Sequence, residues 1–380
     1  MDNEYQKSIL LKATEYANTV IRPRAGEFDR EESLPREIID GLAALGLLGA
    51  AIPQKYGGLG LDPIHYGLLT EIIGKACCST RALLTVHTSL VGETLVKLGN
   101  SEQRERFLPD LAKGSKLSCF ALSEPEVGTD ASSVNTCYEK KGNVFILNGR
   151  KKWITFAVIA DIFLVIAAET ETHKVSAFLV ERTTPGIEIK PMHGLLGNRA
   201  AHTAEIIFTD VEVPEENVLC NLGEGFSFVV NSALFFGRYS IAWAGLAIGQ
   251  AALEEMVGYA RKREQFGQKI GKFQLIQGII ADAVTQIHAS RALCIKAGEA
   301  FLAGDDSAVM DTNIAKYFTS KMASKVASDA VQVFGGNGCW NQYPVERLFR
   351  ESRILEIIEG TSQVQQVMIA NYGMRKYRIK

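Results

Sequence analysis

The sequence predicts an α+β protein in which a helical region, a β region and a second helical region follow one another. Three observations predict this order: helical spacing of apolar residues up to about residue 115, short runs of β-forming residues between turns over 116–222, and long alanine-rich helical patterns beyond 223. We therefore expect an N-terminal helical domain over 1–115, a middle β domain over 116–222 and a C-terminal helical bundle over 223–380.

Several separate helices are predicted in the first region. Apolar residues recur at helical spacing from Ile9 to Ile21, and Pro23 predicts the end of that helix. Three further patterns, separated by glycine-rich breaks such as 57–60, predict helices over 36–47, 64–74 and 81–98.

The middle region alternates short strands with turns. The runs 144–147 and 152–155 flank Asn148-Gly149, a dipeptide typical of tight hairpin turns, so we expect a hairpin there. Further strands are predicted over 163–167, 175–180, 187–189 and 205–208.

The last region contains long helical patterns over 226–262, 273–302 and 311–333, and a final helix after Glu359. Their length and alanine content are typical of closely packed helical bundles.

The composition is that of an ordinary globular protein, with 47% hydrophobic and 22% charged residues in a chain of 380. A net charge of −2 provides no positive field for a polyanion, which argues against nucleic acid as the main partner. The most apolar stretch, 153–168, contains Asp161 and is too short to span a bilayer, so we interpret it as sheet and expect no membrane span.

Cysteine usage and the N-terminus indicate a cytoplasmic protein. The seven cysteines are odd in number and lack CxxC spacing, which argues against a disulfide framework and against a thiolate metal site. The first residues, Met1-Asp2-Asn3-Glu4, lack the basic and apolar regions of a signal peptide. No metal is predicted.

Three segments contain residues suited to binding a flavin nucleotide, whereas no nucleophile elbow, P-loop, HExxH or GxGxxG sequence is present. Residues 120–130 place hydroxyl and backbone N–H groups where the helical region passes into the sheet. Trp153-Ile154-Thr155 offers an indole face for stacking and a hydroxyl group for a ring nitrogen. Arg263, in the charged run 261–267, could grip a phosphate with two parallel hydrogen bonds. Taken singly, each segment also fits an ordinary core, turn or solvated surface.

Together with 332–338, 343–347 and 358–363, these segments resemble the acyl-CoA dehydrogenase superfamily, in order over nearly the whole chain. The resemblance implies an N-terminal helical domain, a central β-barrel-like domain and a C-terminal four-helix bundle. It also implies FAD as the cofactor, a homodimer or a homotetramer built from dimers, and an electron-transfer flavoprotein or oxygen as the electron acceptor.

The resemblance assigns FAD contacts to residues in all three regions. Leu122 and Ser123 would bond the pyrimidine edge of the flavin, and Trp153 and Thr155 would flank its middle ring. Other contacts would reach the FAD of a neighbouring subunit, so that each site would need two subunits. The full set is Phe120, Leu122, Ser123, Thr129, Trp153, Thr155, Thr361 and Gln363, with Arg263, Phe266, Gln274, Gln332, Gly335 and Gly336 reaching the neighbour.

Glu359 resembles the catalytic base of the family. Proton abstraction next to a thioester needs a carboxylate in a water-poor setting, because desolvation raises its pKa towards the operating pH. Ile358 before it and Gly360 after it supply apolar surroundings and room. Some relatives carry the base on the long helix beside an arginine, but Gly237 precedes Arg238 here, which leaves Glu359. A surface carboxylate near a helix start is the alternative.

The expected substrate contacts depart from the common family pattern. Phe235 stands where short-chain members carry an aspartate, and Ile358 replaces the usual tyrosine. The chain looks most like dehydrogenases that act on acyl groups bound to an acyl carrier protein, in the synthesis of hydroxymalonyl, methoxymalonyl or aminomalonyl units for polyketides. A conventional short- or branched-chain acyl-CoA dehydrogenase is the first alternative. The implied substrate contacts are Thr129, Phe235, Arg238, Ile358 and Gly360.

The C-terminal end bears on two further interpretations. DNA-associated flavoproteins of the superfamily carry an added domain and a basic surface, which this sequence lacks. The tail 374–380 nevertheless has four cations in its last six residues. A frayed, solvated end is one interpretation, and our hypothesis is that the tail helps steer an acidic carrier protein to the site.

Overall fold

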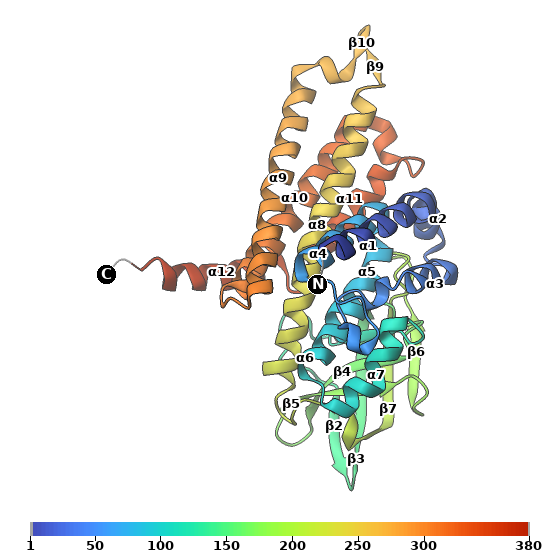
Figure 1. Cartoon of the computed structure of the whole chain (residues 1–380), viewed down its shortest axis with the longest axis vertical. Coiled ribbons are helices and arrows are strands. Elements are labelled where there is room, and N and C mark those ends of the chain that lie inside the picture. Colours follow the sequence, from blue (N-terminus) through green and yellow to red (C-terminus); the bar gives the residue numbers. More distant parts are fainter. Residues whose placement is uncertain (1–2, 379–380) are drawn as a thin grey trace.

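The computed structural model describes residues 3–378, and Figure 1 shows how their elements are arranged. A β-sheet lies at one end of the molecule, and long helices extend from it to the opposite end. The N-terminal helices lie beside the middle of the molecule. This is the predicted α+β class, with helices, sheet and helices in that order.

The first helix does not end at Pro23, so that prediction was wrong. α1 (Asn3–Tyr16) continues through a π-helical turn (Ala17–Ile21) into α2 (Arg22–Glu31). Within this wider turn the N–H of Arg22 donates to the carbonyl of Ala17, five residues earlier. Pro23 therefore falls in the first turn of α2, where the N–H that proline lacks is not required.

The other N-terminal helices lie close to their predicted positions. The predicted helix over 81–98 consists of α5 (Cys78–Leu83), a π-helical segment η4 (Leu84–Glu93) and α6 (Thr94–Leu98). α7 (Ser101–Lys113) was not predicted, although Asn100 and Gln103 form a capping box at its start. The remaining two are α3 (Arg36–Ala44) and α4 (Pro63–Ala76).

One eight-stranded sheet forms the middle region, in the order β6-β7-β3-β2-β4-β5-β8, with β1 pairing in parallel with β4. β4 is buried on both faces: Leu164 packs in the core that includes α7, and Phe163 packs in a separate core on the opposite face. The strands are β1 (Ser118–Ala121), β2 (Cys137–Lys141), β3 (Val144–Ile154), β4 (Ile162–Glu169), β5 (Val175–Glu181), β6 (Ile187–Pro191), β7 (Ala204–Pro214) and β8 (Val218–Leu219).

Asn148 and Gly149 do not form the predicted hairpin turn. They lie inside β3, which pairs with β7 across a register shift between Leu147 and Gly149. A Cβ added at Gly149 would lie 2.6 Å from the Cα of Thr136. Glycine is therefore needed here because another backbone segment approaches closely within a bulged strand. Asn-Gly is found in such bulges as well as in tight turns, so the dipeptide alone does not distinguish them.

Three long helices dominate the last region: α8 (Asn231–Ala260), α9 (Gln274–Ala303) and α10 (Ala308–Phe334). The short hairpin β9 (Glu264–Gln265) and β10 (Gln268–Lys269) joins α8 to α9 at the end of the molecule away from the sheet (Figure 1).

Two shorter helices complete the chain. α11 (Pro344–Leu355) was not predicted, and α12 (Ser362–Lys376) extends away from the body (Figure 1). The predicted basic tail falls partly on α12, and its last two residues, 379–380, lie outside the described range. Over residues 3–378, no helix combines the length and the apolarity needed to cross a membrane.

Candidate active site

Glu359 lies in the short connection between α11 and α12. Its φ of 56° is uncommon for a residue with a Cβ, and Gly360 follows with a φ of 90°. Two cationic side chains hold this connection in place. Arg238 Nε of α8 donates to the Glu359 carbonyl at 2.9 Å, and Lys316 Nζ of α10 donates to the Gly360 carbonyl at 2.7 Å.

The carboxyl group of Glu359 lies against α8 at Gly237. A Cβ added at Gly237 would lie 2.5 Å from Oε2 of Glu359 and 2.7 Å from a methyl carbon of Leu90. Any side chain at position 237 would therefore displace the carboxyl group. The Glu359 carboxyl group therefore packs directly against the α8 backbone at Gly237.

Burial makes Glu359 a stronger base than an ordinary surface carboxylate. Its Oε2 is buried and accepts no hydrogen bond from the described residues. Desolvation raises its pKa to about 7, against the opposing effect of the positive charges of Arg238, Lys316 and Arg81. A carboxyl group with this pKa is suited to accept a proton near neutral pH.

Lys316 and Asn313, both on α10, take part in this arrangement but were not predicted. The Lys316 side chain is fully buried, and desolvation lowers its pKa to about 8 against the effect of the Glu359 charge. Asn313 Oδ1 accepts a hydrogen bond from Arg238 Nη1 at 3.4 Å. Helical spacing places the two residues on one face. A lysine in a helix usually extends to solvent, so no pattern in the sequence indicated that Lys316 is buried.

Leu122 and Ser123 lie on a loop that a buried ion pair anchors. Lys151 Nζ of β3 donates to the Leu122 carbonyl at 3.0 Å and to the Glu124 carboxylate at 2.7 Å. The Glu124 carboxylate also accepts the backbone N–H groups of residues 135–136. The predicted flavin-edge segment therefore has a fixed conformation set by the sheet.

Trp153 and Thr155 follow at the end of β3. Trp153 has a φ of 59°, and its side chain is 48% exposed although the neighbouring Ile154 is buried. A strained backbone that presents a large ring to solvent needs a functional reason. Thr155 begins the next turn and is partly exposed. This arrangement fits the stacking of a planar ring such as that of a flavin.

The second group of predicted FAD contacts lies at the end of α10 and on residues 261–274, which connect α8 to α9 and are called the α8–α9 arm. Phe266, in the β9–β10 hairpin, is 95% exposed and has a φ of 51°. No atom lies within 4 Å of a Cβ added at Gly335 or Gly336, which leaves space for a ligand to approach the backbone. Figure 1 places the hairpin at the opposite end from the sheet that carries Trp153. Also exposed in this group are Arg263, Gln274 and Gln332.

Four other predicted contacts have simpler structural settings. Thr361 Oγ1 accepts the Val364 N–H at 3.3 Å and so caps α12, on which Gln363 is exposed. Thr129 is exposed on the loop after the flavin-edge segment, whereas Phe120 of β1 is partly buried.

Two predicted substrate contacts are apolar. Phe235 packs edge-on against Phe301 of α9, with ring centroids 4.8 Å apart. Ile358 is partly buried against the core of the C-terminal helices. Neither residue offers a polar atom that could replace the aspartate or tyrosine expected at those positions.

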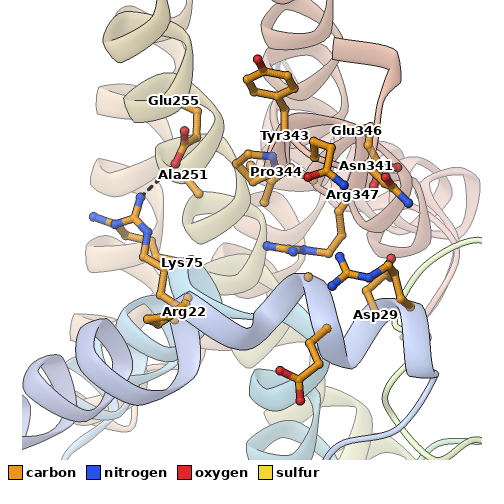
Figure 2. Close-up of a pocket in the computed structure, with 17 residues that line it drawn as sticks. Arg22, Asp29, Lys75, Ala251, Glu255, Asn341, Tyr343, Pro344, Glu346 and Arg347 are labelled. Atoms are coloured by element: carbon orange, nitrogen blue, oxygen red, sulfur yellow. Dashed lines mark hydrogen bonds and ion pairs between the residues drawn. The ribbon is translucent and has the colours of Figure 1, made fainter. Parts of the chain in front are cut away.

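A hollow of about 390 Å³ lies elsewhere, between α2, α8 and the start of α11 (Figure 2). Arg22 and Glu255 are joined across part of it by a hydrogen bond of 3.2 Å. None of the predicted site residues lines this hollow. Within 3–378, no cluster of three or more His, Cys, Asp or Glu side chains could hold a metal ion.

Similarity to known proteins identifies the family. Residues 3–115, 119–211 and 223–373 match the N-terminal, middle and C-terminal domains of acyl-CoA dehydrogenases. The chain belongs to the acyl-CoA dehydrogenase family. It is therefore an FAD-dependent oxidoreductase, and the exposed Trp153, the anchored loop before it and the open backbone at Gly335 fit that cofactor.

Among the curated relatives, an acyl-CoA dehydrogenase of Bacillus subtilis is 37% identical over 97% of this chain and 98% of its own. The mitochondrial short-chain specific acyl-CoA dehydrogenase of Mus musculus is 36% identical over 96% of this chain and 89% of its own. The solved butyryl-CoA dehydrogenase of Megasphaera elsdenii is 36% identical, with a TM-score of 0.94 over 99% of this chain and 100% of its own.

Another similar solved structure is described in the context of polyketide biosynthesis. FkbI, described as serving biosynthesis of the methoxymalonyl extender unit of the polyketide Fk520, is 32% identical, with a TM-score of 0.88 over 96% of this chain and 99% of its own. Its identity to this chain is lower than that of the acyl-CoA dehydrogenases above.

Proposed function

We propose that this enzyme oxidises a short acyl group held as a thioester, with Glu359 removing the proton from the carbon next to the thioester carbonyl. The observation that carries the proposal is the Glu359 carboxyl group, which is buried, unpaired at Oε2 and raised in pKa to about 7. Arg238 and Lys316 bond the backbone of its connection and leave the carboxyl oxygens free. Bound FAD would supply the acceptor for the hydride that leaves the β carbon.

Two groups of residues would hold FAD. Phe120, Leu122, Ser123, Thr129, Trp153, Thr155, Thr361 and Gln363 would come from the subunit that supplies Glu359. A second copy of the chain would supply Arg263, Phe266, Gln274, Gln332, Gly335 and Gly336. The 95% exposure of Phe266, at the end of the α8–α9 arm, supports this division, because a phenylalanine so exposed is expected to be covered by a partner.

A coenzyme A thioester is the substrate carrier that the more similar relatives favour, since they include short-chain specific and butyryl-CoA dehydrogenases. An acyl carrier protein is the second candidate. The similarity to FkbI supports it, as do Phe235 and Ile358, which replace polar residues of conventional members with apolar ones. The substrate would then be a glyceryl- or seryl-derived group for a hydroxymalonyl, methoxymalonyl or aminomalonyl unit.

Anaerobic bleaching of the flavin absorbance tests the proposal. Butyryl-CoA and isobutyryl-CoA are offered to the holoenzyme in parallel with glyceryl and seryl groups on a carrier protein. Bleaching by one of these substrates that is lost in Glu359→Gln, with FAD still bound, supports the function and identifies the carrier. Bleaching that persists in Glu359→Gln would show that another residue is the base.

Reoxidation of the bleached enzyme then identifies the electron acceptor. Return of the absorbance on addition of an electron-transfer flavoprotein, but not of air, supports a dehydrogenase. Rapid return in air supports an oxidase.

A further inference from the structure

Arg81 of α5 is a buried cation without a carboxylate partner. Its side chain has no exposed surface, and no Asp or Glu oxygen among the described residues lies within 4.0 Å of its guanidinium group. Nη1 donates to Thr85 Oγ1 at 2.8 Å and Nη2 to Cys78 Sγ at 3.3 Å, while Nε has no partner. A guanidinium group has five N–H donors, so several remain without an acceptor.

Two other arginines that join elements of this protein are paired with acids, whereas the buried Arg238 bonds a backbone carbonyl and an amide oxygen. Arg350 donates to Asp29 at 2.6 Å, and Arg291 donates to Glu71 at 2.8 Å. Both pairs join helices that are distant in sequence. Burying a guanidinium group without such a pair is costly, because its hydration is lost and not replaced. We therefore expect a bound ligand to supply the acceptor that the Arg81 guanidinium group lacks.

Contacts place Arg81 beside the candidate base. The hydroxyl of Thr85, which accepts from Arg81, lies 2.7 Å from that of Ser240 on α8. Ser240 follows Gly237, on which the Glu359 carboxyl group rests, by three residues, so the two occupy the same face of α8 about one turn apart. The charge of Arg81 is also one of three that act on Glu359.

The acids near Arg81 do not neutralise it by contact. The charge of Arg81 acts to lower the pKa of both Glu359 and Glu351, but neither carboxyl group forms an ion pair with it. Both oxygens of Glu351 are buried without hydrogen bonds. The free donors of Arg81, among them its buried Nε, thus remain without an acceptor.

We propose that Arg81 binds a carboxylate at the distal end of the acyl group, and that the substrate is a short dicarboxylic acyl thioester. A carboxylate can accept two parallel hydrogen bonds from one guanidinium group, including one from the unpaired Nε. The inference rests on the proposed function, because Glu359 must meet the carbon next to the thioester. Thr85, which bonds Arg81, contacts α8 one turn beyond Gly237, so Arg81 and Glu359 are linked to the same stretch of α8, and we infer a short acyl chain.

Ligand binding without turnover tests the site. Holoenzyme carrying Glu359→Gln is titrated with glutaryl-CoA and with pentanoyl-CoA, which have acyl chains of equal length and differ in the terminal carboxylate, while the flavin spectrum is followed. We expect glutaryl-CoA to bind at least about tenfold more tightly, and Arg81→Met in the same background to remove that preference. Arg81→Lys keeps the positive charge but not the two parallel donors, so it should retain part of the preference for glutaryl-CoA. Arg291→Gln, which removes an arginine paired with Glu71 away from the site, should leave the preference unchanged.

The outcomes separate the site from the reaction. Equal affinity for the two thioesters, failure of both to bind, or a preference that survives Arg81→Met in protein with normal FAD content overturns the carboxylate site. If Arg81→Met does not retain FAD, the Glu359→Gln protein and its Arg81→Lys derivative are compared instead. Tighter binding of glutaryl-CoA than of pentanoyl-CoA that is reduced in Arg81→Lys then supports the site, and an unreduced preference overturns it. A clear preference in the binding experiment, combined with no bleaching of the wild-type enzyme by any thioester, would instead overturn the proposed oxidation and leave the site standing.

Discussion

The position of the proposed base, Glu359, depends on a glycine of α8. Because a Cβ at Gly237 would lie 2.5 Å from Oε2 of Glu359, alanine there must push the carboxyl group aside. Overpacking of this kind costs about 1–3 kcal/mol, so we expect Gly237→Ala to slow flavin reduction by about tenfold or more. Gly258→Ala on the same helix is the control, since no atom lies within 4 Å of its Cβ position. Equal rates in the two variants would contradict this account of the site.

The raised pKa of Glu359 predicts how the reaction depends on pH. The base must be ionised, so the rate of flavin reduction should rise with pH through about 7 and level off above it. The effect on stability has the opposite sign. A carboxyl group whose pKa is raised from 4.5 to about 7 in the folded state stabilises the fold fully below pH 4.5, and this contribution is lost as the pH rises through 7. Stopped-flow bleaching at a series of pH values checks the rate, and a profile that falls with pH would be the contrary result.

Lys316 should position Glu359 and lower its pKa. Lys316→Met removes the hydrogen bond to the Gly360 carbonyl and one positive charge near Glu359, so we expect the midpoint of the pH profile to move upward. A purely structural role would lower the rate or the melting temperature without moving the midpoint. Lys325→Met removes an exposed lysine of the same helix, paired with Asp329, and should leave the profile unchanged.

At this scale the sequence identified the site only where a motif was available. Glu359 and the residues around Trp153 could be named because they belong to recognisable segments. Arg81, Asn313 and Lys316 could not, because their roles depend on burial and on which helix faces them. A charged residue in a helix has the same appearance in a sequence whether it contacts water or a buried carbonyl.

The connection of β3 to the flavin-edge loop depends on a buried ion pair. Lys151 and Glu124 have side-chain exposures of 0% and 1%, and their nitrogen and oxygen lie 2.7 Å apart. Removing one partner of such a pair leaves a buried charge, so we expect Glu124→Gln to lower the free energy of unfolding by about 3–5 kcal/mol and to weaken FAD retention. Thermal unfolding and the flavin-to-protein absorbance ratio measure the two effects.

An exposed pair between β2 and the turn that follows β7 provides the control. Lys140 and Glu215 are 2.9 Å apart with exposures of 45% and 56%, and Glu215→Gln should cost at most about 1 kcal/mol. Similar losses in the two variants would mean that burial is not what makes the first pair important.

Helices and strands were predicted well where one periodicity continued without interruption, and poorly at irregularities. Pro23 and Asn148-Gly149 are usually breaks, yet the chain passes through both, by a π-helical turn before the proline and a bulge at the glycine. At the bulge the deciding factor is a neighbouring element, because the pairing of β3 with β7 continues on both sides of it. Such support is non-local and cannot be derived from a short window of sequence.

The residues proposed to hold FAD fall into two distant groups in the whole molecule. The sheet and the α11–α12 connection carry one, and the end of the α8–α9 arm carries part of the other (Figure 1). The proposed boundaries, 1–115, 116–222 and 223–380, enclose the three family matches. Sequence patterns could give the order of these parts, but how two copies combine depends on surfaces that only the folded chain presents.

A mixed oligomer tests whether one site takes residues from two subunits. One chain carries Glu359→Gln with its arm intact, and the other carries Arg263→Glu and Phe266→Asp with Glu359 intact. Each should be inactive alone. If the arm serves the neighbour, half of randomly mixed dimers combine the two chains, and one of their two sites has both an intact base and an intact arm. About a quarter of all sites should then be active, as measured by flavin bleaching of the co-expressed protein. If each arm served its own subunit, mixing would restore nothing, and the division of the FAD site between subunits would be wrong.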